Sequence, residues 1–262
     1  MADTIRDVAI ITKINNAEAE TAAKRITNLL VTRRIRVYSI LPLALDNSTN
    51  VTAEDLKNIS VDLAFAVGGD GTTLKAFRII PYNTPLISMN IGGHRGVLSE
   101  VGVDSIESAI EMIVTGQYFH DFRLRIQASI NGNIIPPALN DIVFTRLNLT
   151  KTPTLSLKLM DDEINQRMDG IIISTATGST AHSYSIGGPL LYENMSCLIL
   201  NPIASINRMP GLVIPAINIE IRRWIAFCKT CGKAYDPKIT ECALCGNRLR
   251  HRYKKSWGMK VK

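Results

Sequence analysis

The apolar segment Val61–Val67, which runs directly into a glycine-rich turn, constrains the fold more than any other feature of the chain. The turn reads Gly68-Gly69-Asp70-Gly71-Thr72, and a helical pattern over Leu74–Ile79 follows it. A strand, a glycine turn and a helix in this order are typical of a parallel sheet. The other strands and helices expected in this part of the chain lie at Asp7–Ile11, Ala17–Thr32, Arg36–Ile40, Pro85–Asn90 and Asp104–Thr115.

The pattern changes after about residue 120, where short β-type runs replace the alternation of strands and helices. The runs over 123–130 and 154–160 alternate apolar and polar residues, as antiparallel strands with one solvated face do. We therefore predict an α/β fold class with an α/β domain at 1–120, a β-rich domain at 121–221 and a basic tail at 222–262.

The net charge of +7 is unevenly distributed along the chain. Residues 1–221 carry 18 Lys and Arg against 21 Asp and Glu, whereas residues 222–262 carry 12 against 2. The 46% share of hydrophobic residues excludes disorder as the main state. The sequence contains no run of about 18 apolar residues, which a transmembrane helix needs, and its first residues lack the features of a signal peptide. We expect a cytoplasmic protein without membrane contact.

The glycine turn favours an anion, because its backbone can approach a phosphate closely at the N-terminus of a helix. It also carries Asp70, whose carboxylate would repel a phosphate. That carboxylate makes sense as a base for a hydroxyl, or as a contact to a metal or a ribose. The alternative is a tight turn in which Asp70 caps the helix. The spacing matches neither a Walker loop nor Gly-x-Gly-x-x-Gly.

Three further segments place polar residues at the ends of predicted strands. Gly92-Gly93-His94-Arg95-Gly96 follows the next parallel strand and should lie beside the first turn, where ligands bind to such sheets. The loop Thr175–Ser183 is rich in small hydroxyl residues, which either wrap a purine or ribose or form a solvated turn. Asn140-Asp141 is either a buried polar pair or a pair that contacts a sugar.

In order and spacing, the four segments together resemble the NAD kinase (ATP–NAD kinase) family, and look most like its archaeal members. The resemblance runs from about residue 8 to residue 221 and includes Gly187-Gly188-Pro189. It implies a Rossmann-like N-terminal domain, a β-rich C-terminal domain and NAD between them. The implied reaction transfers a phosphoryl group from ATP, or polyphosphate in some members, to the 2′-hydroxyl of the adenosine ribose. The product is NADP, Mg²⁺ or another divalent ion is needed, and a homodimer or homotetramer is expected.

The resemblance also implies roles for individual residues. Asp70 would be the base or positioning group at the 2′-hydroxyl, Arg167 would pair with phosphate, and Asp169 would help to define the adenine pocket. The other nucleotide-binding residues that it implies are Gly69, Gly71, Thr72, Asn140, Asp141, Thr177, Ser179, Thr180, Ala181, His182 and Ser185.

The chain departs from the family pattern at three places. Asp141 stands where the family usually has Glu, and His182 stands where a Tyr usually stacks near the adenine. Beyond Glu220 the β-rich domain of the family usually continues through further strands, whereas this chain has its basic tail there. This difference predicts a shortened second domain.

Four of the five cysteines lie in the tail as two Cys-x-x-Cys-Gly pairs, at Cys228, Cys231, Cys242 and Cys245. Four thiolates suit tetrahedral Zn²⁺ in a closed structural site, with iron or a redox dithiol as the alternative. The module resembles a zinc ribbon and should depend on its metal to fold. The fifth cysteine, Cys197, is expected to be a buried apolar residue.

The end of the tail interleaves cations with aromatic residues over Arg248–Trp257. Such a segment either contacts nucleic acid or has a structural use, including packing against the body in place of the missing strands. Two alternatives to the kinase stay open. One is a weak or inactive dinucleotide-binding protein that acts as a nucleic-acid or protein adaptor. The other is a lipid kinase of the diacylglycerol kinase type, where Gly-Gly-Asp-Gly also occurs, although the loop Thr177–Ala181 argues against it.

Overall fold

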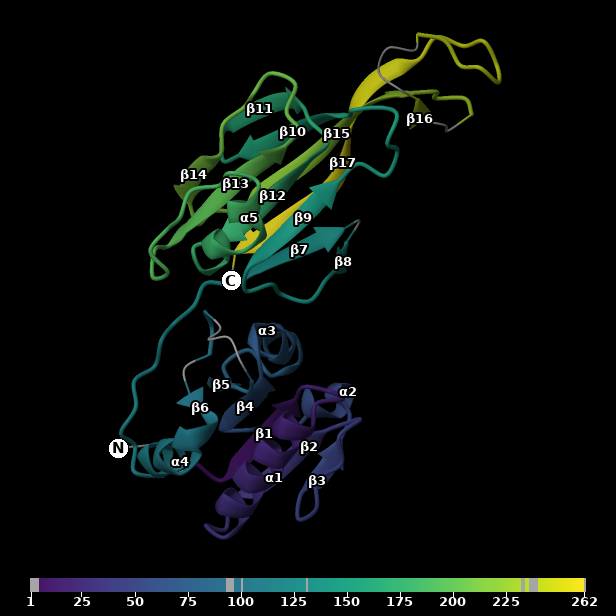
Figure 1. Cartoon of the computed structure of the whole chain (residues 1–262). Coiled ribbons are helices and arrows are strands. Elements are labelled where there is room, and N and C mark those ends of the chain that lie inside the picture. The colour runs from purple at the N-terminus through teal and green to yellow at the C-terminus, as the bar shows by residue number, and fades with distance from the viewer. Residues whose placement is uncertain are drawn as a thin grey trace. The chain divides into compact units, whose positions relative to one another are not determined.

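The chain forms two compact units, Met1–Asp121 and Phe122–Lys262. The computed structural model (Figure 1) describes residues 5–92, 97–99, 101–130, 132–231, 234–235 and 240–261. For residues 223–227, 234 and 251–261 it describes the backbone. Most of the second glycine turn, including His94 and Arg95, lies outside the described residues.

The first unit is built on a parallel sheet whose described strands follow the order β3-β2-β1-β4-β5-β6. The chain order reverses between β1 and β4, and ligands of such doubly wound folds bind at the carboxyl ends of the strands beside this reversal. The predicted parallel sheet is confirmed. Its strands are β1 (Asp7–Thr12), β2 (Arg36–Ile40), β3 (Thr49–Val51), β4 (Leu63–Gly68), β5 (Leu86–Asn90) and β6 (Val101–Gly102).

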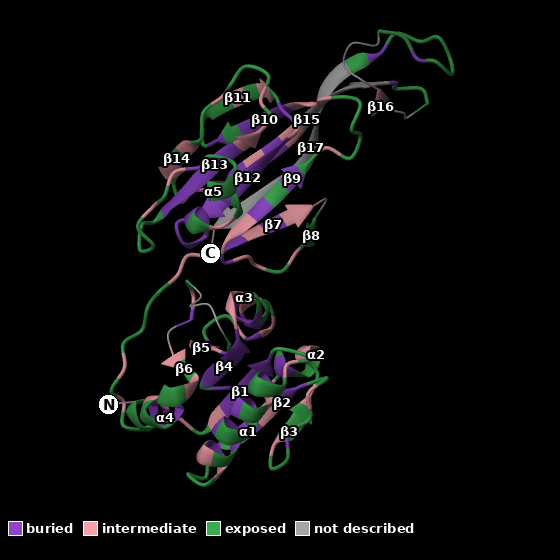
Figure 2. Ribbon diagram, in the orientation of Figure 1, coloured by how far each residue is buried: buried purple, intermediate pink, exposed green. Residues whose placement is uncertain are grey.

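The sheet of the first unit is covered by helices on both faces, so its central strands are buried on two sides (Figure 2). Val8 and Ile10 of β1 pack in the core under α1 and α4, while Ala9 and Ile11 pack in the core under α2 and α3. Burial on both faces explains why these strands read as continuous apolar runs. The helices are α1 (Ala17–Val31), α2 (Ala53–Leu56), α3 (Asp70–Ile79), the 3-10 helix η1 (Val103–Ser105) and α4 (Ile106–Val114).

The second unit consists of two antiparallel sheets, which confirms the predicted β-rich second half. One sheet has the order β11-β10-β15-β17-β7-β8 with β16 beside β15, and the other has the order β14-β13-β12-β9. The strands are β7 (Ile126–Ile130), β8 (Asn133–Ile134), β9 (Asp141–Thr145), β10 (Thr154–Leu159), β11 (Asp162–Arg167), β12 (Gly170–Thr175), β13 (Cys197–Ile203), β14 (Leu212–Pro215), β15 (Ile219–Phe227), β16 (Ala234–Tyr235) and β17 (Arg250–Val261). Two short helices follow β12, the 3-10 helix η2 (Thr177–Thr180) and α5 (His182–Ser185).

One apolar core lies between the two sheets of the second unit. Ile126 of β7 and Leu157 of β10 contribute from the larger sheet, and Phe144 of β9 and Ile171 of β12 contribute from the smaller one. Cys197, at the start of β13, is 7% exposed, as expected of a buried apolar residue. The smaller sheet is therefore held in place by packing against the larger one through this core.

The basic tail supplies strands to the larger sheet. Strand β15 runs through residue 222 to Phe227, with a bulge between Ile221 and Arg222. Strand β17 then returns antiparallel to β15 and pairs with β7 on its other side. This is the structural use of the tail that the sequence left open beside nucleic-acid contact.

Two local differences from the sequence-based prediction concern the first unit. Helix α3 begins at Asp70 instead of Leu74, because Gly69 is the N-cap residue and the turn is tighter than expected. The polar connection after β2 contains the short strand β3 and leads to α2, whose cap Thr52 forms a reciprocal capping box with Asp55. Among the described residues, no helix is long and apolar enough to cross a bilayer.

Candidate nucleotide and metal sites

The glycine turn lies where a nucleotide is expected in a doubly wound fold, at the carboxyl end of β4 beside the reversal of strand order. The backbone N–H of Lys13, which follows β1, donates to the carbonyl of Val67 at 2.9 Å. On the other side, the N–H of Ile91 after β5 donates to the carbonyl of Gly68 at 3.0 Å. The first glycine turn and the described start of the second, Ile91-Gly92, therefore follow neighbouring strands, as their position in the sequence predicted.

Asp70 does not cap the helix through its side chain, so the alternative offered by the sequence is wrong on this point. Its Oδ2 accepts the backbone N–H of Val97 at 3.0 Å, and its Oδ1 accepts that of Leu98 at 3.1 Å. The hydroxyl of Ser99 also donates to Oδ1, at 3.4 Å. A carboxylate has about four acceptor positions. Oδ1 accepts from two described donors, whereas Oδ2 accepts from one. Oδ2 therefore keeps an acceptor position for a ligand.

A chain of hydroxyl groups leads from Asp70 into the buried interior of the first unit. Ser99 Oγ lies 3.3 Å from Ser88 Oγ on β5, and Ser88 Oγ in turn contacts Thr73 Oγ1 on α3. All three residues are buried. Since buried hydroxyls that bond to one another hold their neighbours in fixed positions, this chain of hydroxyl groups ties α3, β5 and the segment after the second glycine turn to the carboxylate. Neither Ser88 nor Ser99 stands in a recognisable motif, and only the folded sheet brings them together.

The three glycines of the turn have different structural reasons to be glycine. A Cβ atom on Gly68 would collide with Thr72 Oγ1 and come within 2.9 Å of Lys13 Cβ, so the fold itself requires glycine there. A Cβ atom on Gly69 or Gly71 would meet nothing within 4 Å. Open space beside two glycines at a helix N-terminus exposes backbone amides to a ligand.

In the second unit, Thr175 joins two segments that the sequence singled out separately. Its N–H donates to the carbonyl of Asn140 at 2.9 Å, and its Oγ1 accepts the N–H of Gly178 at 3.0 Å. Gly178 packs so closely that a Cβ atom there would collide with the carbonyl oxygen of Asn140. The structure therefore brings Asn140, at the start of β9, against the hydroxyl-rich loop after β12.

The residues of this loop divide into anchored and exposed ones. Thr177 and Ser179 are buried, and Ser179 Oγ accepts the N–H of Leu191 at 3.1 Å. The Ser185 hydroxyl donates to the carbonyl of His182 at 2.7 Å. Thr180 and His182 are exposed, and Ala181 is half-buried. Thr180 and His182 are thus the side chains that the loop presents to a ligand.

Asp169 has two partners that the sequence reasoning missed. Arg146 reaches Asp169 Oδ2 at 2.7 Å, and the Thr152 hydroxyl donates to Asp169 Oδ1 at 2.9 Å. Asp169 precedes β12 by one residue, and Arg146 follows β9 by one residue, so the pairing of these strands brings them together. A signal did exist in the sequence, since Arg146 follows the apolar run Ile142–Phe144 and Asp169 precedes the apolar run Ile171–Ile173. Arg167 is exposed at the end of β11.

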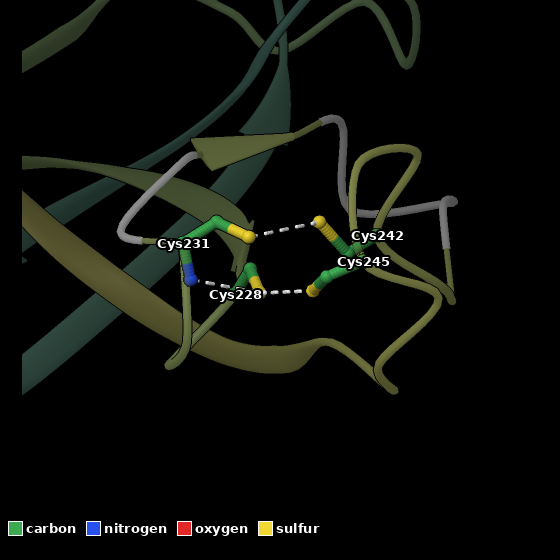
Figure 3. Close-up of side chains that lie close together, drawn as sticks. All are labelled: Cys228, Cys231, Cys242 and Cys245. Carbon is green, nitrogen blue, oxygen red and sulfur yellow. Dashed lines mark hydrogen bonds between the residues drawn. The ribbon is translucent and has the colours of Figure 1, made fainter.

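The four cysteines of the tail converge, as Figure 3 shows. Their sulfur atoms all lie within 4.8 Å of one another, with 3.5 Å between Cys228 and Cys245 and 3.9 Å between Cys231 and Cys242. Four sulfurs bound at about 2.3 Å to one tetrahedral Zn²⁺ lie about 3.8 Å apart. The donor type and the spacing therefore fit a zinc ion, and in the part of the chain that the structure describes this is the group that could hold a metal.

Tyr235 on β16 hydrogen-bonds to one of the cysteines. Its hydroxyl lies 3.1 Å from Cys242 Sγ. This contact lowers the pKa of the Cys242 thiol to about 6 and raises the pKa of Tyr235 to about 12. The neighbouring sulfurs, Cys245 first, raise the pKa of Cys231 to about 12. The lowered pKa of Cys242 favours its thiolate, which is the form that binds a metal.

The fold and the glycine turn define a nucleotide-binding α/β unit that is followed by an antiparallel β unit. Residues 8–118 match the model of the ATP-NAD kinase N-terminal domain, and residues 139–232 match that of the ATP-NAD kinase C-terminal domain. The chain belongs to the NAD kinase family.

Named relatives agree with this assignment. The NAD kinase of Thermococcus sibiricus is 34% identical over 222 residues, which cover 81% of this chain and 78% of the relative. That of Methanothermobacter thermautotrophicus is 32% identical over 203 residues, which cover 75% and 70%.

Two solved structures share the fold. One is yeast NADH kinase complexed with NADH, with a TM-score of 0.76, 18% identity and coverage of 99% of this chain and 81% of the other. The other is an NAD kinase from Archaeoglobus fulgidus in complex with ATP, with a TM-score of 0.67, 22% identity and coverage of 98% and 90%.

Proposed function

We propose that the chain is an NAD kinase that transfers a phosphoryl group from ATP, or from polyphosphate, to the 2′-hydroxyl of the adenosine ribose of NAD, giving NADP. The two domain models and the named relatives support the activity. The same matches favour a dinucleotide over a lipid as the acceptor, which leaves the diacylglycerol-kinase alternative the weaker one.

The observation that carries the proposal is the placement of Asp70. Its carboxylate is fixed by the amides of Val97 and Leu98, yet Oδ2 keeps a free acceptor position. In the proposed reaction this oxygen accepts the hydrogen of the 2′-hydroxyl and aims the ribose oxygen at the phosphorus. The amides beside Gly69 and Gly71, with Thr72, hold the phosphates. Phosphoryl transfer depends mainly on such positioning and on neutralisation of charge.

Mg²⁺ fits this turn as an ion that arrives with ATP. It is usually held by one or two carboxylates together with substrate phosphates and water. Asp70 is the carboxylate at the turn, and the described residues form no larger carboxylate cluster there. The ion would neutralise charge on the phosphates, while Asp70 and the backbone amides set their position.

We propose that the second unit binds the dinucleotide through the loop after β12 and the segments joined to it. The exposed Thr180 and His182, with Ala181, are the proposed adenine contacts, and Asp169 is held toward the same role by Arg146. Asn140 holds the loop through its backbone carbonyl, so its side-chain amide serves the ribose. The further proposed contacts are Asp141, Arg167, Thr177, Ser179 and Ser185. The hydroxyl of Ser179 is already bonded to Leu191, and that of Ser185 to His182.

The variant Asp70→Asn tests the proposed catalytic role. It keeps the size of the side chain but removes the charge that attracts the 2′-hydroxyl hydrogen, so NADP formation should fall by about 10²–10⁴-fold. The measurement is NADP formation from NAD, ATP and Mg²⁺, with the melting temperature recorded alongside. Asp46→Asn, at an exposed carboxylate of the same unit, is the control. Equal rates in the Asp70 variant and the parent chain would exclude the role.

We further propose that the four cysteines bind structural Zn²⁺ and that the chain forms a homodimer or homotetramer. The sulfur spacing supports the first proposal, and the family resemblance supports the second. Zinc content per chain and mass by light scattering are the measurements.

The nucleic-acid adaptor stays a prediction about the tail. Exposed cations next to the cysteines, Lys229, Arg248 and Arg250, are consistent with it. Removal of residues 222–262 is an unsuitable test, because it also removes β17 from its place between β15 and β7. Replacing the three cations by Gln in the full chain keeps the sheet. If the salt dependence of RNA or DNA binding does not change, the adaptor is excluded.

A further inference from the structure

Strand β17 has a central place in the larger sheet of the second unit. Among the described strands, it is the one that joins β15 to β7, since it pairs with β15 over Ile219–Phe227 and with β7 over Ile126–Ile130. Without β17, the sheet separates into β11-β10-β15 on one side and β7-β8 on the other. Each part would then expose a row of unpaired backbone groups.

The connection that leads from β15 to β17 is long and has little core of its own. Hairpin loops usually contain two to five residues, whereas this connection covers residues 228–249. Among its described residues, Cys228, Cys242 and Leu249 are the buried ones that form an apolar cluster, with Tyr235 packed against them. Closing so long a loop costs entropy, and so small an apolar cluster cannot offset that cost.

The cysteines sit where they can close this loop. Cys228 follows the last residue of β15, Phe227, and Leu249 precedes the first residue of β17, Arg250, which pairs with Phe227. The second cysteine pair is bonded to the same end of the hairpin, since the N–H of Leu249 donates to the carbonyl of Thr240 at 2.7 Å. A metal bound to all four sulfurs therefore fixes both strand ends at the open end of the hairpin.

Register is the property that such a fixed point controls. The bulge between Ile221 and Arg222 shifts the pairing of β15 with β17 by one residue, from Trp257 opposite Ile221 to Lys255 opposite Arg222. A slip by one residue turns every side chain of a strand to the opposite face. Anchoring Phe227 against Arg250 excludes that slip.

We propose that Zn²⁺ bound by the four cysteines is a clasp that holds β17 in register between β15 and β7, and so controls the folding of the whole second unit. The inference rests on the proposed zinc site. Ile126 of β7 and Ile221 of β15 pack in the same core as Phe144 and Ile171 of the smaller sheet, which carries the proposed dinucleotide contacts. Loss of zinc therefore acts on the body of the molecule as well as on the tail.

The test is hydrogen exchange on the full chain, kept under a thiol reductant, before and after removal of zinc by a chelator. The parent protein should contain one zinc ion per chain. Its removal should speed the exchange of the β7 and β15 backbone amides by roughly tenfold or more, and added Zn²⁺ should reverse the change. Exchange that rises only within 228–249 would overturn the inference while leaving the zinc site intact. A chain that binds no zinc would overturn both.

Variants of an exposed cysteine separate the metal from the side chain itself. Cys231→Ser removes a ligand and should reproduce the zinc-free exchange pattern in β7, whereas Cys231→His keeps a zinc ligand and should retain protection. Leu244→Ser, in the same loop and 62% exposed, is the matched control. Equal protection of β7 in the Ser and His variants, at different zinc contents, would contradict the clasp.

Discussion

At the scale of single residues, glycines that look alike in the sequence have different physical roles in the fold. Gly178 is in contact with the Asn140 carbonyl, so no Cβ atom fits. Gly71 has open space around it and lies in the first turn of α3. The packing of the protein does not require glycine at this position, whereas the close approach of a ligand to the backbone would.

This difference predicts opposite effects of the same substitution. Gly178→Ala should destabilise the chain by about 1–3 kcal/mol, because the added methyl group forces the backbone apart. Gly71→Ala should leave stability unchanged or raise it by up to about 1 kcal/mol, yet should raise the KM for ATP by obstructing the approach of phosphate. Urea unfolding and steady-state kinetics are the measurements. An unchanged KM for ATP in Gly71→Ala would show that the turn does not bind the phosphates of ATP.

Also at this scale, the sequence could identify Asp70 and the small-residue loop but not what holds them. Asp70 follows an apolar strand in an unusual glycine context, so it could be recognised from neighbours in the chain. Ser88 and Ser99, which support it, are ordinary serines whose role depends on the pairing of β4 with β5. Arg146 likewise becomes a partner of Asp169 only through the pairing of β9 with β12.

At the scale of elements, the short strand β16 positions a tyrosine against the cysteine cluster. The hydrogen bond from Tyr235 lowers the pKa of the Cys242 thiol, and so favours the thiolate that binds a metal. Tyr235→Phe removes that bond and should weaken zinc binding by about tenfold or more, which competition with a chromophoric chelator measures. Because protons compete with zinc, the loss should be larger at pH 6 than at pH 8.

The control for this prediction is Tyr192→Phe, at a tyrosine that is 72% exposed. It should bind zinc as the parent chain does. If Tyr235→Phe binds zinc with the affinity of the parent at both pH values, the tyrosine does not tune the site.

The central strands β1 and β4 of the first unit were predictable, because burial on both faces makes each of them a continuous apolar run. The long apolar run of β4 and the helical spacing of α1 needed no tertiary information. Strands β15 and β17 were not predictable, since the basic residues of the tail hide their strand character. In addition, β17 pairs with β7, where Trp257 lies opposite Ile130, a residue about 130 positions upstream. A pattern rich in Lys and Arg indicates an exposed segment, whereas the sheet needs only one face of a strand to be apolar.

At the scale of the whole molecule, the tail is part of the second unit and is not a separate appendage. Its net charge suggests a separate appendage, but its last strand lies between β15 and β7 of the second unit. The cysteine module is thus inserted in a hairpin of the enzyme body, and its charge resides partly on a strand of that body. This is why the sequence predicted a shortened second domain while the structure shows its larger sheet continued through β15 and β17.

The central claim is that this chain phosphorylates NAD at the adenosine ribose. The most direct test incubates purified, zinc-loaded protein with NAD, Mg²⁺ and ATP labelled at the γ-phosphate, and locates the label in the product. We expect labelled NADP with the phosphate on the 2′-oxygen. Absence of any labelled dinucleotide with ATP, together with no NADP from polyphosphate, or a label at another oxygen, would contradict it.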